Sequence, residues 1–139
     1  MKINHNLTAI SLFICLSFYS CKKKYSDGPF FSFYSREARV ANTWKMQLVT
    51  LNDVDITKNY TDINYTETYD KDASYSYNST TITGKGKWEF ESDYTLIKRS
   101  AVSGQSTQDL IILRLKQKSF WYKYADGKNN YEFHLIPDE

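Results

Sequence analysis

The sequence predicts an all-β domain: an eight-stranded antiparallel up-and-down barrel preceded by a short N-terminal helix. Aromatic residues make up 17% of the 139 residues, and aromatic side chains favour strands. Short alternations of apolar and polar residues recur at the spacing of about 8–12 residues that is typical of sandwiches and barrels. No helical pattern of about 10–15 residues separates them, which excludes parallel β–α–β units.

The first predicted elements are a short helix and the strand that follows it. The helix covers Ser35–Ala41, with Ser35 as its N-cap, and ends before Asn42. The first strand, Thr43–Leu51, alternates so that one face carries three apolar side chains. These side chains are Trp44, Met46 and Leu48.

Seven further strands follow, separated by turn-forming residues. They are predicted at Ile63–Tyr69, Ala73–Tyr77, Ile82–Glu91, Thr95–Ser100, Asp109–Lys116, Phe120–Tyr124 and Tyr131–Ile136. Thr57–Asp62 and Ser103–Gln108 are expected to be loops, and Asp126–Asn130 a hairpin loop. A meander of eight strands can close on itself, and its interior then holds side chains or one small ligand.

The N-terminus predicts an export signal. Residues 7–20 are apolar or small, and this run is shorter than the roughly 20 apolar residues that span a bilayer. Ser20 then precedes Cys21, which resembles a bacterial lipobox, where cleavage before the cysteine leaves the cysteine acylated. Phe18 and Tyr19 depart from the common lipobox pattern. An ordinary cleaved signal and an uncleaved anchor are therefore the alternatives.

The two cysteines support this division of the chain. Cys15 lies inside the apolar run, and no cysteine follows Cys21, so the domain has no internal disulfide, thiol nucleophile or cysteine-ligated metal. We expect a signal peptide at residues 1–20, a lipidated Cys21 and tether at 21–29, and the barrel domain at 30–139. The expected location is the bacterial cell envelope, where the lipid anchors the protein to the outer membrane. The sequence does not decide between the periplasmic and the outer surface of that membrane.

Two segments resemble a known family. Asn42-Thr43-Trp44 begins the first strand after the short helix, and FWYKYADGKNNYEFHLIP (Phe120–Pro137) reads as a closing hairpin. Both resemble the lipocalin-like lipoproteins of Bacteroidetes. Lipocalins carry Gly-x-Trp in the first strand, so the resemblance implies that Trp44 plugs the closed barrel end, although Asn42 replaces the glycine. It also implies, by analogy of fold alone, a barrel that binds small apolar molecules.

The predicted function is a membrane-anchored binding module for a small, partly apolar ligand. The expected lining residues are Tyr75, Tyr77, Trp88 and Phe90, which lie on inward strand faces. One alternative is a structural or protein-interaction envelope lipoprotein with a solid core, and another is a surface protein that binds glycans. Tyrosines cluster between residues 60 and 77, and ordinary packing with each hydroxyl in water also explains them.

Other chemistries find little support. One histidine, His134, lies in the domain, which argues against a hydrolytic triad. Glu89 and Glu91 share an outward strand face, which indicates an acidic surface and not a glycosidase pair. Asp70–Asp72 begins like a calcium loop but lacks its glycine and its bidentate glutamate, so we expect a turn. A net charge of +2 suggests no nucleic-acid interface. We therefore predict no enzyme, metal or cofactor, and no protein partner can be named.

Overall fold

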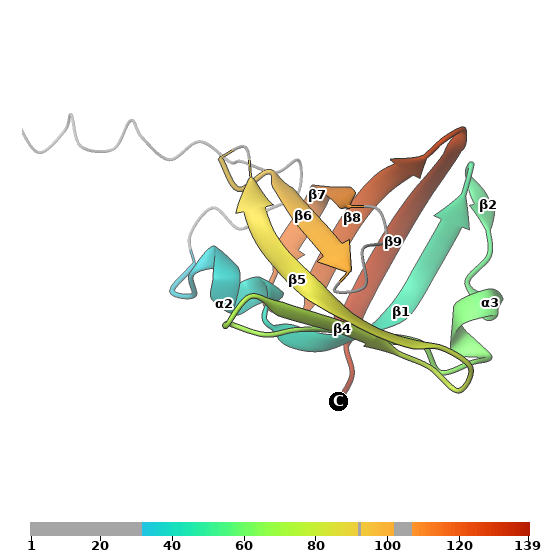
Figure 1. The fold of residues 1–139 in the computed structure, drawn as a ribbon, viewed down its shortest axis with the longest axis horizontal. Coiled ribbons are helices and arrows are strands. Elements are labelled where there is room, and N and C mark those ends of the chain that lie inside the picture. Colours follow the sequence, from blue (N-terminus) through green and yellow to red (C-terminus); the bar gives the residue numbers. More distant parts are fainter. Residues whose placement is uncertain (1–31, 92, 102–106) are drawn as a thin grey trace, which may run out of the picture.

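The computed structural model describes residues 32–91, 93–101 and 107–139, and in them the predicted all-β barrel is confirmed (Figure 1). The barrel strands are β1 (Asn42–Leu51), β3 (Thr66–Tyr69), β4 (Ser74–Asn78), β5 (Thr83–Glu91), β6 (Leu96–Ala101), β7 (Gln108–Lys116), β8 (Ser119–Asp126) and β9 (Asn129–Pro137). Each strand pairs antiparallel with the next in this series, and β9 pairs back with β1. This last pairing closes the barrel.

Two short helices mark the two ends of the barrel. Helix α2 (Arg36–Val40) forms as predicted, because the Ser35 hydroxyl accepts a hydrogen bond from the backbone N–H of Ala38 at 3.1 Å. Helix α3 (Lys58–Thr61) follows β2 (Val54–Asp55), a two-residue strand that pairs with β1. Figure 1 shows α2 and α3 on opposite sides of the barrel. We name the end beside α2 the closed end, and the end beside α3 the open end.

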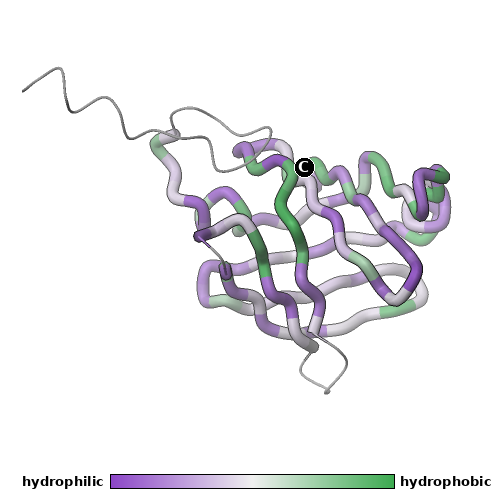
Figure 2. The backbone as a smooth tube through the Cα atoms, turned by 90° about the horizontal axis from the view of Figure 1, so that it is seen from above, coloured by the Kyte–Doolittle hydropathy of each residue, from purple (hydrophilic) through white to green (hydrophobic). Residues whose placement is uncertain are grey.

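Alternation along the strands separates the interior from the surface. Figure 2 shows the strands as repeated changes between hydrophilic and hydrophobic colour. Strand β8 has buried Phe120 and Tyr122 separated by the less buried Trp121, and β9 buries Phe133 and Leu135 in the same way. This pattern is typical of antiparallel sheets with one solvated face.

The prediction of which β1 side chains point inward is wrong for the second half of the strand. Pairing with β9 shifts register between Met46 and Leu48, which is the signature of a β-bulge, where one extra residue is inserted. Trp44 and Met46 point inward as expected, but Val49 is then fully buried in place of Leu48. A bulge reverses the faces because the side-chain period of a strand is two.

Connections between strands differ from the prediction in four places. The expected loop at Thr57–Asp62 contains α3. The hairpin loop predicted at Asp126–Asn130 is only a two-residue turn, with Gly127 at a φ of +59°. Ala73 belongs to a turn, at a φ of +66°, and not to the strand that follows it. Of the loop predicted at Ser103–Gln108, Gln108 begins β7, and residues 103–106 lie outside the described residues.

Candidate functional site

The barrel interior contains a cavity at the open end. Its volume is about 260 Å³, just below the roughly 300–1,000 Å³ of pockets for drug-sized ligands. The residues that line it are Tyr60, Tyr65, Glu67, Tyr75, Tyr77, Ile82, Lys85, Arg99, Gln108, Tyr124 and Phe133. They come from α3, from seven of the barrel strands and from the connections at this end, so closure of the barrel brings them together. Aromatic walls with a few polar groups are typical of small-molecule sites.

An ion pair forms the floor of this cavity. Arg99 Nη1 lies 2.9 Å from Glu67 Oε1, and the two side chains are 8% and 1% exposed. Glu67 is on β3 and Arg99 on β6, each on the inward face of its strand. Arg99 Nε and Nη2 also donate to Gln108 Oε1, at 3.0 and 2.6 Å. Buried charges need such partners, because their mutual attraction alone barely offsets the cost of removing them from water.

Tyrosine hydroxyls complete the hydrogen bonding of the Glu67 carboxylate. Tyr69 donates to Oε2 at 2.9 Å, and Tyr122 lies 3.1 Å from both oxygens. Tyr65 and Tyr75 donate to Oε1, each at 3.3 Å. The expectation that the hydroxyls of the tyrosine cluster between residues 60 and 77 stay in water is therefore wrong for Tyr69 and Tyr75, which are buried. Tyr122, on β8, is buried as well.

Burial fixes the protonation of these groups. It raises the pKa of Tyr69 and of Tyr122 well above the ordinary value, and the negative charge of Glu67 raises both further. Burial lowers the pKa of Arg99, but Glu67 together with Tyr69, Tyr122 and Tyr75 more than offsets this effect, so that this pKa lies well above its usual range. At neutral pH the two phenols therefore stay protonated as donors and Arg99 stays charged.

The mouth of the cavity is aromatic and carries hydroxyls available to a ligand. Tyr60, from α3, packs edge-on against Phe133 with ring centroids 5.5 Å apart. The hydroxyls of Tyr60, Tyr77 and Tyr124 make no hydrogen bond to another residue that the structure describes. Gly84 lets the Tyr77 ring lie against β5, because a Cβ at Gly84 would be 2.3 Å from that ring.

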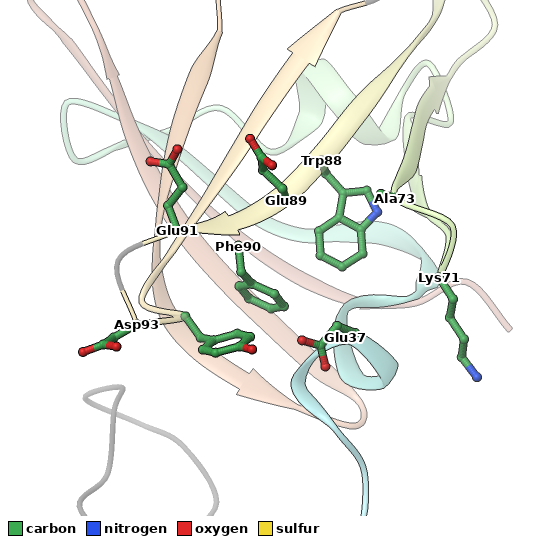
Figure 3. A pocket seen from close by; sticks show the side chains of 9 residues that line it. Glu37, Lys71, Ala73, Trp88, Glu89, Phe90, Glu91 and Asp93 are labelled. Atoms are coloured by element: carbon green, nitrogen blue, oxygen red, sulfur yellow. The ribbon is translucent and has the colours of Figure 1, made fainter.

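The predicted lining residues divide between two pockets. Tyr75 and Tyr77 line the cavity described above. Trp88 and Phe90 line a second pocket of about 460 Å³ at the closed end, beside α2. Figure 3 shows their rings on the same side of β5 as Glu37, while Glu89 points to the other side. The four residues therefore do not form one site.

Trp44 lies at the closed end and is fully buried. Its indole Nε1 donates to the Val40 carbonyl at 2.8 Å, which ties β1 to the end of α2. Its ring packs against Phe120 with centroids 5.8 Å apart. Arg39 also links α2 to the barrel, through a hydrogen bond from Nη1 to the Leu115 carbonyl at 2.8 Å.

Sequence reasoning missed the residues that carry charge inside the barrel. Glu67 alternates with Tyr65 and Tyr69 along the chain and therefore shares their strand face. Arg99 follows Ile97 by two residues and therefore shares its inward face. The pair could have been identified from a single charged residue on each of two otherwise apolar strand faces, one acidic and the other basic.

The remaining residues singled out in the sequence lie apart from the cavity. His134 is on the outer side of β9, stacked on Trp121 at a centroid distance of 3.8 Å, with Nε2 2.7 Å from Glu132 Oε1. Glu91 lies beside Lys98 on the outer surface. Across residues 32–91, 93–101 and 107–139, no three His, Cys, Asp or Glu side chains gather as a metal site.

The predicted signal peptide, the tether and Cys21 lie outside the described residues, as do the first two residues of the predicted domain. In the part of the chain that is described, no helix has the length and apolar character needed to cross a membrane.

Comparison of the chain with models of known protein families and with curated proteins gave no match.

Proposed function

We propose that this protein is a lipocalin-like binding module that holds a small, partly apolar ligand inside its barrel. The observation that carries the proposal is the cavity at the open end, with aromatic walls and a hydrogen-bonded Glu67–Arg99 pair at its floor. Rings bury apolar ligand surface, and the polar floor and hydroxyls orient the ligand.

The buried pair supports a binding role more than a purely structural one. Replacing a buried ion pair by apolar residues of similar volume is often neutral or stabilising. A barrel whose only task is to be a stable solid core therefore gains little from Glu67 and Arg99. A barrel that must recognise a polar group on an apolar ligand does gain from them, because buried polar groups give discrimination.

Titration with small aromatic probes tests this proposal. We expect indole and toluene to bind the purified domain at a stoichiometry of one in native mass spectrometry and to raise its unfolding temperature. Tyr77→Ala, which removes a wall of the cavity, is expected to weaken indole binding about tenfold. Phe90→Ala, in the second pocket, is the matched control and should leave indole affinity unchanged. Absence of binding by both probes would count against a binding role and for the solid-core alternative.

We also propose that Cys21 carries the lipid that anchors this barrel to a membrane. The support is the sequence alone: an apolar run that ends at Ser20-Cys21, with no other cysteine after it. Two or more acyl chains hold a small domain on a bilayer stably. Cys21→Ala should move the protein from the membrane fraction to the soluble fraction with an unchanged circular dichroism spectrum. If the variant stays with the membrane, the lipid anchor is wrong.

A further inference from the structure

The floor of the cavity carries two opposite charges that cancel. Glu67 and Arg99 pair at 2.9 Å, and both are more than nine-tenths buried. Lys85 is the other ionisable residue with a formal charge among the lining residues, and it is exposed to solvent. Water screens exposed charges strongly, so the deep part of the cavity presents no net charge to a ligand.

At the floor, the carboxylate oxygens of Glu67 and the amide oxygen of Gln108 already accept hydrogen bonds, whereas some N–H donors of Arg99 and Gln108 stay unused. The Glu67 oxygens together accept from Arg99 and from four tyrosine hydroxyls. A guanidinium has five N–H groups, and contacts to Glu67, Tyr69 and Gln108 account for four of those of Arg99. One Nη2 hydrogen remains, and the amide NH₂ of Gln108 makes no hydrogen bond to a described residue.

We infer that the ligand is an uncharged, planar molecule of one or two rings whose carbonyl or hydroxyl oxygen accepts hydrogen bonds from Arg99 and Gln108. This inference rests on the proposed binding function and names its ligand class. The ring lies among the aromatic walls, where Tyr65 and Tyr77 already stack with centroids 5.9 Å apart. A carboxylate or an ammonium group loses its hydration on entry and finds no net opposite charge in return.

Three probes of one shape and different charge test this inference. Benzoate, benzamide and benzamidine share a phenyl ring and a planar three-atom head, and at neutral pH their charges are negative, zero and positive. In calorimetric titrations of the wild-type domain we expect benzamide to bind about tenfold more tightly than either ion. Tighter binding of benzoate or of benzamidine would overturn the inference.

Two substitutions at the floor change its charge in opposite directions. Glu67→Gln removes the negative charge, so Arg99 is left uncompensated, and benzoate should become the tightest of the three ligands. Gln108→Glu adds a negative charge beside Arg99, and benzamidine should then bind best. Gln108 is only partly buried, so this variant tests the inference even where Glu67→Gln fails to fold. An unchanged preference in a folded variant would overturn it.

The outcomes separate the ligand class from the binding function. If indole binds but benzoate or benzamidine exceeds benzamide, the barrel is a binding module with a charged ligand, and only the inference fails. If indole, toluene and all three probes fail to bind, both the proposed function and the inference fail.

Discussion

The two ends of the barrel bury their polar groups in different ways. At the closed end, Trp44 and Arg39 donate to backbone carbonyls of Val40 and Leu115, and the Trp44 ring packs against Phe120. At the open end, polar side chains bond to one another and border a cavity. The closed end also has a pocket, of about 460 Å³, but none of the buried charged side chains that the structure describes lines it. Backbone partners are fixed by the fold, whereas polar side-chain partners beside a cavity leave a place for a ligand. The comparison assigns stability to the closed end and binding to the open end.

The largest expected effect on stability comes from removing the buried Trp44 side chain at the closed end. Trp44→Ala should lower the free energy of unfolding by about 3–5 kcal/mol, because it leaves a cavity and removes the bond to Val40. Denaturant titration measures this loss. Indole affinity of the folded variant should remain that of the wild type, with Trp44→Phe as the milder control. A loss below about 1 kcal/mol, or a large change in affinity, would contradict the division between the two ends.

Alkaline pH should destabilise the tyrosine network next. The pKa values of Tyr69 and Tyr122 are raised by burial above their values in the unfolded chain. Their contribution to the free energy of unfolding is therefore fully present below about pH 10. Above that pH it is lost by about 1.4 kcal/mol per pH unit for each group. The part of the tyrosinate absorbance that comes from Tyr69 and Tyr122, taken as the difference from a variant with Tyr69→Phe and Tyr122→Phe, should rise together with loss of the circular dichroism signal. If this part rises while the circular dichroism signal is retained, the two phenols are accessible in the folded protein.

A smaller effect is expected at the mouth of the cavity. Gly84→Ala places a Cβ where the Tyr77 ring now lies, so the ring must move, at a cost of about 1–3 kcal/mol. We expect weaker indole binding as well, because Tyr77 is part of the cavity wall. In the background of Tyr77→Ala, the same substitution should have little further effect on stability. Equal losses in both backgrounds would indicate that the two residues do not contact.

The smallest effect is expected at the cap of α2. Ser35→Ala removes the hydroxyl that accepts from Ala38, which should cost about 1 kcal/mol. Thermal unfolding measures the change, and Ser35→Gly is the control with a smaller expected loss. Ligand affinity at the open end should not change. An altered affinity would mean that the two ends are coupled.

The sequence predicts the barrel well because alternation is a local property. Each strand of β4 to β9 shows its inward face in its own residues, and turn residues such as Gly127 mark the hairpins. The bulge after Met46 escaped prediction because it depends on the pairing of β1 with β9, far along the chain. Helix α3 is only four residues long, too short for a periodic pattern to reveal.

The candidate site was only partly predictable for the same reason. Tyr75 and Tyr77 were expected to line a pocket from their shared strand face, and they do lie together at the cavity. Trp88 and Phe90 share a face with Gly84 but lie further along β5, which places them at the other end of the barrel. Alternation gives the face of a residue but not its height in the barrel, which depends on the registers of all eight strands.

Nuclear magnetic resonance mapping of a bound probe tests the central claim most directly. We expect benzamide to shift the backbone amide signals of Tyr65, Tyr75, Tyr77 and Tyr124, and to leave those of Val40, Trp44 and Phe120 at the closed end in place. Shifts confined to the closed end or to the pocket around Trp88 and Phe90, or no shifts at saturating benzamide, would contradict it.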